Sequence, residues 1–261
     1  MDVKDAIVVV TGGASGIGAA LARRFSADGA ANVVVVDLDL AGAQAVADEI
    51  DGVAECVDVT DPAAVNGLVD RTLARVGRID LFCSNAGMAT GVGLDDPNDL
   101  WHRAFEVNLM SQVYAARAVI PPMLERGRGY LLQTASAAGL LTSPGDAPYT
   151  VTKHGAVALA EWLSVTYGSQ GIGVSVLCPM GVATPLLMDP LAAGEPGAQA
   201  VAASGEIIST EQVADAVIAG LAEERFLILP HPQVGTFWAQ KASDPDRWLA
   251  GVRRLLSNRS N

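Results

Sequence analysis

Short runs of valine, isoleucine and leucine recur along the chain, with longer alanine-rich stretches between them. The runs are nearly continuous in hydrophobicity instead of alternating with polar residues, which is typical of strands covered on both faces. We expect strands at 6–10, 32–37, 53–57, 79–84, 129–134, 173–178 and 225–230. The regular change between strand and helix predicts an α/β fold with a doubly wound, seven-stranded parallel sheet.

The stretches between these strands have the length and the periodicity of helices. In the segment 16–30, Ile17, Leu21 and Phe25 are four residues apart and form one apolar helix face. Asp28 and Gly29 follow, and glycine at this position commonly ends a helix. The segment 16–30 is therefore expected to pack one face of a helix against the sheet.

The chain is expected to form one domain, 1–261, because its length suits a single large α/β core. The segment 184–209 is rich in Pro, Gly and Ala and is too long for an ordinary connection, so we expect a lid. A C-terminal extension, 231–261, carries Trp238, Trp248 and Leu255 without an obvious core partner. It is expected to dock on its own substrate cleft or on a neighbouring subunit.

The chain is acidic, with a formal net charge of −12. This charge argues against nucleic acid and against anionic membranes as partners, because both require basic patches. No apolar run approaches the length of a membrane span, and the apolar run near the start has acidic flanks instead of the basic ones of a signal peptide. We expect a cytoplasmic protein whose partner is a small-molecule substrate.

The cysteines at 56, 83 and 178 each stand at the end of an apolar run. Their odd number and their buried-looking positions indicate free thiols in a reducing compartment, not a disulfide framework. Their spacing fits no metal site, and the histidines are scattered along the chain, so no metal is expected.

Glycines gather at the junction between the first strand and the first helix. The motif is Gly12-x-x-x-Gly16-x-Gly18, with Ser15 and Ile17 between the glycines. Glycine lets the backbone turn tightly and approach a diphosphate, which then faces the positive end of the helix. A plain tight turn is the alternative, but the position between a strand and an amphipathic helix favours a Rossmann-type dinucleotide site.

Asp37 ends the second strand, nineteen residues after Gly18. A carboxylate there can accept hydrogen bonds from the adenosine ribose hydroxyls and would repel a 2′-phosphate. Positions 15 and 38, where a 2′-phosphate would need a cation, hold Ser15 and Leu38. We therefore expect NAD as the cofactor instead of NADP; the alternative is that Asp37 only caps the next helix.

Tyr149 and Lys153 are four residues apart and so lie on one face of a helix. Such a pair alone is usually a solvated surface. Together with the glycine loop and Asp37, however, it resembles the short-chain dehydrogenase/reductase family in its short single-domain branch. The resemblance covers residues 4 to about 184.

Further positions match the family pattern. By resemblance, Ser136 and Asn108 join Tyr149 and Lys153 as catalytic residues, and the last two also contact the cofactor. The remaining cofactor-binding positions that the resemblance implies are Asp58, Val59, Asn85, Ala86, Gly87, Pro179, Val182 and Thr184. Two positions depart from the pattern: Ser84 replaces an asparagine, and Met180 replaces a glycine after Pro179.

Hydride transfer from a carbinol carbon requires that the hydroxyl lose its proton at the same time. Tyr149 is expected to be the base, with its pKa lowered by the charges of Lys153 and the nicotinamide. Ser136 would orient and polarise the substrate oxygen. By resemblance, Asn108 would hold a water that relays protons from Lys153. His154 points away from Lys153 on the helix and is expected to be structural or at a subunit contact.

The substrate pocket is expected to form from Met88, the segment 138–146, Met180 and the lid. Leucines and a methionine give it an apolar character, namely Leu140, Leu141, Leu186, Leu187, Met188 and Leu191. No Arg or Lys occurs at 129–152 or 154–224. We therefore expect a neutral, fairly hydrophobic secondary alcohol or its ketone as substrate.

Two other function classes stay open on the sequence alone. A non-catalytic NAD-sensing or scaffold protein would be expected to lose Tyr149, Lys153 or Ser136, all of which are present. A methyltransferase or a nucleotide-sugar epimerase could share the glycine loop and the acid, but the glycine spacing favours the dehydrogenase. The family resemblance also implies a homotetramer or homodimer, packed through helices near 99–124 and 149–168.

Overall fold

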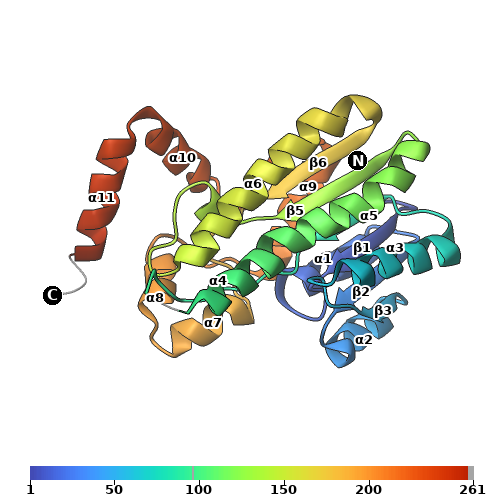
Figure 1. The fold of residues 1–261 in the computed structure, drawn as a ribbon, viewed down its shortest axis with the longest axis horizontal. Coiled ribbons are helices and arrows are strands. Elements are labelled where there is room, and N and C mark those ends of the chain that lie inside the picture. The colour runs from blue at the N-terminus through green and yellow to red at the C-terminus, as the bar shows by residue number, and fades with distance from the viewer. Residues whose placement is uncertain (96, 258–261) are drawn as a thin grey trace.

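A single parallel sheet forms the centre of the computed structural model, which describes residues 1–95 and 97–257 and side chains as far as Arg254 (Figure 1). The order β3-β2-β1-β4-β5-β6-β7 confirms the predicted seven-stranded, doubly wound architecture. The strands are β1 (Ile7–Thr11), β2 (Asn32–Asp37), β3 (Val53–Cys56), β4 (Leu81–Ser84), β5 (Gly129–Thr134), β6 (Ile172–Leu177) and β7 (Leu227–Ile228).

Helices connect the strands and cover both faces of the sheet. They are α1 (Gly16–Ala27), α2 (Leu40–Glu49), α3 (Pro62–Val76), α4 (Asn98–Phe105), α5 (Ser111–Glu125), α6 (Ala147–Tyr167), α7 (Pro185–Ala192), α8 (Pro196–Ala202), α9 (Thr210–Ala222), α10 (Gln233–Ser243) and α11 (Pro245–Ser257). A π-helix, η1 (Glu106–Met110), joins α4 to α5, and the 3-10 turns η2 (Ala137–Gly139) and η3 (Gly168–Gln170) flank α6.

The two faces of the sheet have separate hydrophobic cores. Along β1, Val9 packs into the core under α3, α5 and α6, whereas Val8 and Val10 pack under α1, α2 and α9. All three valines are fully buried. Because both faces are covered, the strands carry continuous hydrophobic runs, as the sequence pattern predicted.

The outermost strands depart most from the predicted pattern. β7 is shorter than expected because it pairs on one side only, with β6. At the other edge, Cys56 ends β3 and is exposed, which corrects the expectation that all three thiols are buried. An edge strand has a neighbour on one side only and leaves its last side chain open to solvent.

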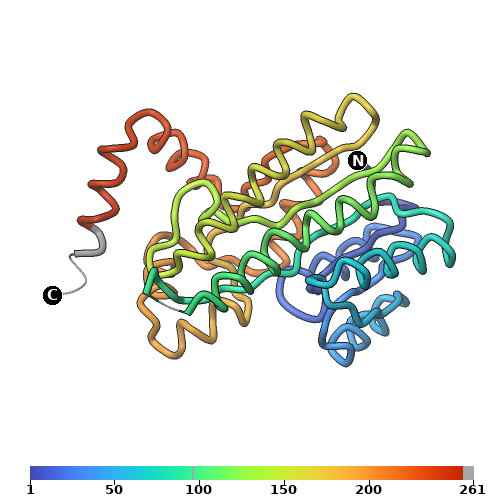
Figure 2. Tube along the Cα trace, in the orientation of Figure 1, coloured from blue at the N-terminus to red at the C-terminus, as the bar shows by residue number. Residues whose placement is uncertain are grey.

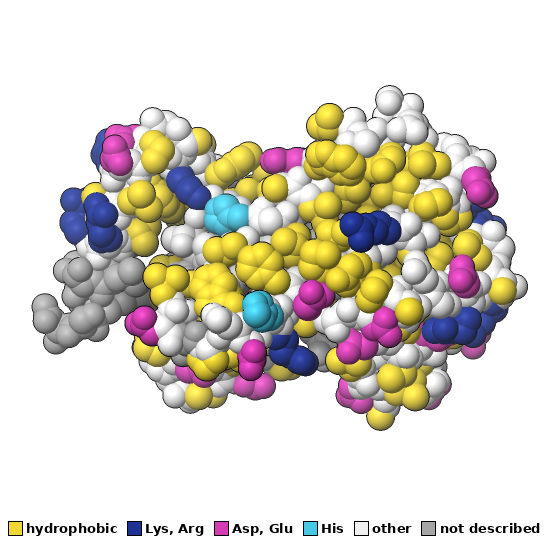
Figure 3. Space-filling model, in the orientation of Figure 1, with side chains coloured by type: hydrophobic (Ala, Val, Ile, Leu, Met, Phe, Trp, Pro, Cys, Tyr) yellow, Lys and Arg dark blue, Asp and Glu magenta, His cyan; other side chains and the backbone are white. Residues whose placement is uncertain are grey.

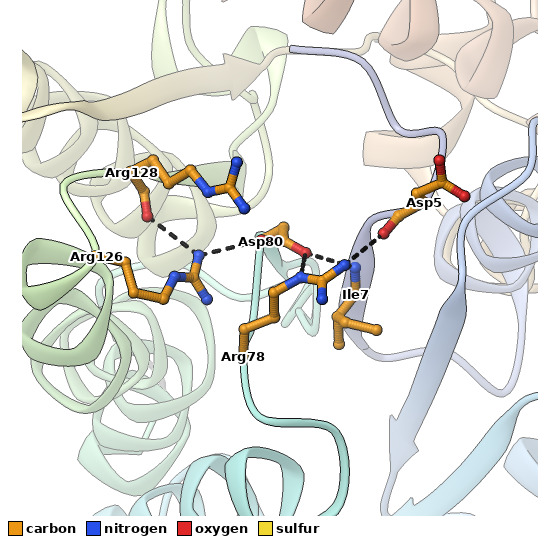
Figure 4. A network of polar contacts seen from close by, with 6 residues as sticks. All are labelled: Asp5, Ile7, Arg78, Asp80, Arg126 and Arg128. Atoms are coloured by element: carbon orange, nitrogen blue, oxygen red, sulfur yellow. Dashed lines mark hydrogen bonds and ion pairs between the residues drawn. The ribbon is translucent and has the colours of Figure 1, made fainter.

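The amino ends of the central strands are tied together by Asp80 (Figure 4). Its carboxylate accepts the backbone N–H of Ile7 at 2.9 Å and pairs with the guanidinium groups of Arg78 and Arg126 at 2.8 and 3.1 Å. These contacts join β1, the start of β4 and the turn before β5. This end of the sheet is therefore closed by structural ion pairs, which leaves the carboxyl ends for a ligand.

Two parts of the chain lie outside the layered body. The predicted lid, 184–209, contains the short helices α7 and α8, and neither of them has a buried residue. Helices α10 and α11 form an arm that projects from the body (Figures 1 and 2). The rings of Phe237 and Trp248, 6.1 Å apart, hold the two helices of the arm together. The side chain of Leu255, which we expected to belong to this apolar face, lies outside the described residues.

Candidate active site

A cleft of about 2010 Å³ opens at the carboxyl ends of the strands. It lies where β1 pairs with β2 on one side and with β4 on the other, which is the switch point at which doubly wound sheets bind ligands. All predicted cofactor-binding residues except Gly18 line this cleft, as do Ser136, Tyr149 and Lys153. The structure thus brings together positions spread over some 170 residues of sequence.

The glycine loop forms the floor of the cleft. Gly12 has a φ of +65°, and a Cβ there would lie 2.9 Å from the Cα of Ala86, so only glycine fits. Gly18 faces the loop instead of the cleft, because a Cβ on it would lie 2.0 Å from the carbonyl oxygen of Gly12. Gly18 therefore allows close packing of α1 against the loop, and its assignment to the cofactor site stays a prediction.

The amino end of α1 is open toward the cleft. Among the described residues, no side chain caps this end, and the first turn holds no acidic residue. The free N–H groups and the positive end of the helix dipole suit a diphosphate. The loop thus offers the uncapped N–H groups and the positive helix end that the phosphates of a dinucleotide would need.

Asp37 is held at the side of the loop by two hydrogen bonds. Its carboxylate accepts the backbone N–H of Ala14 at 3.0 Å and of Asp39 at 3.1 Å. The side chain that caps α2 is Asp39, which accepts the N–H of Gly42. Asp37 is therefore not the cap of the next helix, and it faces the cleft together with Leu38.

Asp58 and Val59 line the same end of the cleft. Hydrogen bonds from the backbone and hydroxyl of Thr60 lower the pKa of Asp58, and the charge of Arg103 lowers it further. Arg103 comes from α4 and also lines the cleft, although the sequence pattern did not single it out.

Thr11 positions the segment after β4 and was missed in the sequence. Its hydroxyl accepts the N–H groups of Asn85 at 3.0 Å and of Ala86 at 3.1 Å. The amide of Asn85 donates back to the carbonyl of Thr11 at 3.1 Å, and its oxygen accepts the hydroxyl of Thr134 at 3.1 Å. These bonds join the carboxyl ends of β1, β4 and β5, so Asn85 acts mainly as a structural link.

Three of the predicted catalytic residues converge in the middle of the cleft. Lys153 is 3 % exposed, and its ammonium donates to the carbonyl of Thr134 at 3.1 Å. The same nitrogen lies 5.5 Å from the ring centre of Tyr149. Ser136 lies close enough to Tyr149 to lower its pKa, and the Ser136 hydroxyl accepts the N–H of Ala138 at 3.1 Å.

The pKa of Tyr149 is raised, not lowered as we expected. Burial is the largest cause, the charge of Asp146 adds to it, and the hydrogen bond with Ser136 opposes it. Burial also lowers the pKa of Lys153 to about 8, so this lysine is still mostly charged at neutral pH but loses its proton at lower pH than an exposed lysine. The residues of the chain alone therefore favour the neutral phenol.

Asn108 lies below the cleft in the π-helix η1 and is fully buried. Its amide oxygen accepts the N–H of Met88 at 2.8 Å, and its nitrogen donates to the carbonyl of Met88 at 2.9 Å and to Thr152 at 3.2 Å. A Cβ on Gly87 would lie 3.3 Å from both the Asn108 oxygen and the Lys153 nitrogen. Gly87 thus keeps open a small space between these two polar atoms.

The segment after β6 forms the wall next to Tyr149. The carbonyl of Pro179 accepts the N–H of Ala137 at 2.7 Å, which joins this wall to the turn that carries Ser136. Val182 and Thr184 also line the cleft.

His231, which the sequence left unassigned, braces this wall from behind. Its Nδ1 accepts the N–H of Met180 at 3.2 Å, and its Nε2 lies 3.1 Å from the carbonyl of Gly181. The Met180 backbone is therefore held in place even though methionine replaces the glycine of the family pattern.

The substrate half of the cleft is apolar, but fewer leucines line it than predicted. Met88, Leu141, Met180, Leu186 and Leu187 line it. Leu140 packs into the core instead, and Met188 and Leu191 are not part of the lining. Leu140 follows directly on η2, and Met188 and Leu191 belong to α7, short turns that periodicity alone could not place.

Residues of the arm are also part of the lining of the cleft. Phe237 of α10 and Trp248 of α11 line it, together with Arg247 and Arg254. These cations come from beyond the two segments that the sequence analysis found free of Arg and Lys.

His154 has a structural role, as expected. Its Nδ1 lies 2.9 Å from the carbonyl of Thr150, and its Nε2 lies 3.4 Å from the ammonium of Lys241. Lys241 of α10 also donates to the carbonyls of Leu140 and Leu141 at 2.8 and 2.7 Å. The base of the arm is thereby attached to the substrate-facing segment. Over the part of the chain that the structure describes, no group of three or more potential ligands is arranged for a metal ion.

Comparison with known proteins decides the family. The model of the short chain dehydrogenase family matches residues 6–193. The chain belongs to the short-chain dehydrogenase family. It is therefore an oxidoreductase of this family, and the cofactor class that the family uses is the nicotinamide dinucleotides.

Relatives act on hydroxyl groups, according to their names. A 1-deoxy-11-beta-hydroxypentalenate dehydrogenase of Streptomyces avermitilis is 38 % identical over 259 residues, which cover 96 % of this chain and 93 % of that protein. A D-beta-hydroxybutyrate dehydrogenase of Rhizobium meliloti is 33 % identical over 187 residues, covering 69 % and 72 %.

A solved structure has the same fold. The short-chain dehydrogenase/reductase from Burkholderia phymatum, crystallised in complex with NAD, superposes with a TM-score of 0.86 at 27 % identity. The match covers 94 % of this chain and 96 % of that one. Among the described residues of the present short-chain dehydrogenase, no helix has the length and apolar character required to cross a membrane.

Proposed function

We propose that this short-chain dehydrogenase interconverts a secondary alcohol and its ketone, with NAD as the hydride carrier. The observation that carries the proposal is the convergence of Tyr149, Lys153 and Ser136 in a cleft whose other half is apolar. A sensor or scaffold protein has no use for a half-buried phenol beside a buried ammonium and a buried hydroxyl in such a cleft.

In the proposed reaction Tyr149 takes the proton of the substrate hydroxyl and Ser136 holds the substrate oxygen. The raised pKa of Tyr149 keeps the phenol protonated, which is the form needed in the direction of ketone reduction. For alcohol oxidation, a further positive charge next to the phenol is needed to favour the phenolate. Bound NAD would supply the hydride acceptor and this charge.

Lys153 would hold the ribose of the cofactor and exchange protons with Tyr149. Its pKa of about 8 lets it give up a proton near neutral pH more readily than an exposed lysine. We propose that the space between Lys153 and Asn108, kept open by Gly87, holds the water of a proton relay.

The preference for NAD over NADP is supported by the position of Asp37. Its carboxylate lies beside the glycine loop and would repel a 2′-phosphate, and Leu38 next to it is 57 % exposed and uncharged. The related structure from Burkholderia phymatum, which carries NAD, is consistent with this preference.

The substrate is proposed to be neutral and fairly hydrophobic. Methionines and leucines from three segments give the substrate half apolar surface, and the cleft is large enough for a bulky alicyclic or aryl-alkyl alcohol. The relation to a hydroxypentalenate dehydrogenase agrees with a bulky alcohol.

A second candidate is an alcohol that carries a carboxylate at its far end. Arg247 and Arg254 of the arm line the cleft and could bind such a group. The relation to a hydroxybutyrate dehydrogenase is in line with an acid substrate.

The test is NADH formation from NAD and a panel of secondary alcohols that differ in size and charge, run beside Tyr149→Phe. We expect activity with bulky alcohols and a kcat/KM for NAD at least about tenfold that for NADP. In Tyr149→Phe we expect the activity to fall by about 10²-fold or more. Activity on small hydroxy acids alone would contradict the proposed substrate. No turnover with any alcohol, although NADH binds, would favour the sensor alternative.

A further inference from the structure

Asp146 is a buried carboxylate that the mechanism above does not use. It is 7 % exposed and caps the amino end of α6, where it accepts the N–H of Tyr149 at 3.0 Å. The same carboxylate accepts the N–H of Thr90 at 2.7 Å, the hydroxyl of Thr90 at 2.6 Å and the N–H of Gly91 at 2.8 Å. A single helix cap needs one such bond, so three of the four serve another purpose.

The segment that Asp146 binds is part of the substrate wall. Residues 88–91 line the cleft and follow directly on Gly87 of the cofactor side. The near end of this segment is held by Asn108 at Met88, and the far end by Asp146 at Thr90 and Gly91. Gly91 has a φ of +65°, a turn that is held in place by its bond to the carboxylate.

We propose that Asp146 is a positioning residue that couples the substrate-facing segment 88–91 to the turn of α6 that carries Tyr149. The proposal rests on the proposed function for the role of Tyr149 as the acid and base. The carboxylate binds both elements at once, so the distance between the substrate wall and the catalytic hydroxyl is set by one side chain.

The charge of Asp146 has a second effect, which is on the protonation of Tyr149. It raises the pKa of the phenol, as does burial, because an anion nearby disfavours the phenolate. The other groups that face Tyr149 are Lys153 on the same helix, Ser136 just before η2 and Cys178 after β6. Removal of the Asp146 charge should therefore lower the pKa of Tyr149 and move the acid limb of alcohol oxidation to lower pH.

The test is Asp146→Asn in the full chain with NAD bound. The ionisation of Tyr149 is followed by ultraviolet difference titration against the same protein carrying Tyr149→Phe. We expect the midpoint to fall, and we expect the KM for the alcohol to rise about fivefold or more as bonds to the substrate wall are lost. A purely structural cap would change stability without moving the midpoint.

Two matched variants separate the effects. Asp61→Asn removes the charge of another helix cap, that of α3, which is exposed and outside the cleft, and it should change neither KM nor midpoint. Thr90→Val keeps the Asp146 charge but removes one of its bonds, so it should raise KM and leave the midpoint unchanged.

If Asp146→Asn does not fold, Asp146→Ser replaces it in the test, because serine can still cap the N–H of Tyr149 but carries no charge. If neither variant folds, the KM of Thr90→Val decides whether the proposal holds. The proposal would be overturned if the Asp146 variant had the same titration midpoint and the same KM as Asp61→Asn. An unchanged KM in Thr90→Val would also overturn it. The titration requires no turnover, so it tests the effect of Asp146 on Tyr149 even if the proposed reaction is wrong.

Discussion

Single side chains in this short-chain dehydrogenase are tuned mainly by burial. Lys153 is almost fully buried and its pKa falls to about 8, while the pKa of Tyr149 rises. Both groups are driven toward their neutral forms because a low-dielectric surrounding disfavours charge. His231 follows the same rule, since burial lowers its pKa and it accepts a hydrogen bond from Met180.

Acid is expected to destabilise the protein through His231. Its pKa is lower in the folded than in the unfolded state, so its contribution is complete above about pH 6.5 and is lost as the pH falls through the folded pKa. His231→Asn keeps an acceptor for Met180 but cannot titrate. We expect it to cost about 1–2 kcal/mol of unfolding free energy at pH 8.

Thermal unfolding between about pH 5 and 8 checks this expectation. The melting temperature of the wild type should fall more steeply below about pH 6.5 than that of His231→Asn. Parallel curves would show that His231 does not carry the acid sensitivity.

At the level of elements, α6 carries Tyr149 and Lys153 on one face and His154 on another. The first face lines the cleft, and His154 contacts Lys241 of the arm. Lys241 also holds the carbonyls of Leu140 and Leu141, between the turn of Ser136 and the start of α6. One ammonium thus connects three elements around the substrate half of the cleft.

Lys241→Met should loosen this connection, because it removes the ammonium and keeps an unbranched side chain only one atom shorter. We expect the KM for bulky alcohols to rise about fivefold, since hydrogen bonds to two carbonyls are lost, while the KM for NAD stays the same. Lys4→Met, at an exposed position outside the cleft, is the control. Steady-state kinetics give both constants, and an equal rise in both would indicate a general loss of structure.

For the whole molecule, the exposed apolar surface on α6 supports assembly. Val151, Trp162 and Val165 lie on one side of this helix and are 46 %, 58 % and 85 % exposed. Figure 3 shows hydrophobic side chains gathered over the face that α5 and α6 form. We propose that a second copy of the chain covers this face in a homodimer or homotetramer, as the family resemblance implied.

Glutamates at Trp162 and Val165 should dissociate such an assembly, because they place charges in an apolar interface. Light scattering coupled to gel filtration should give a smaller mass for the double variant than for the wild type. Leu94→Glu, at an exposed leucine that is not part of α6, should leave the mass unchanged. A wild type that already runs as a monomer would refute the proposed assembly.

Local patterns in the sequence determined much of this protein. The continuous hydrophobic runs predicted the buried parallel sheet, because strands covered on both faces have no polar side. Gly12, Asp37 and the Tyr149–Lys153 pair could be found because the turn, the strand end and the helix that carry them require fixed spacings.

Contacts between distant segments were decided only by the tertiary structure. Asp146 binds Thr90, 56 residues away, and Lys241 binds Leu140, 101 residues away. The hydrophobic periodicity of the sequence cannot predict such pairs, since they depend on how loops at one end of the sheet fold against each other. The direction of the pKa shift of Tyr149 was likewise decided by the tertiary structure. The residue types suggested a lowered pKa, whereas the burial and the nearby anion that raise the pKa exist only once the chain is folded.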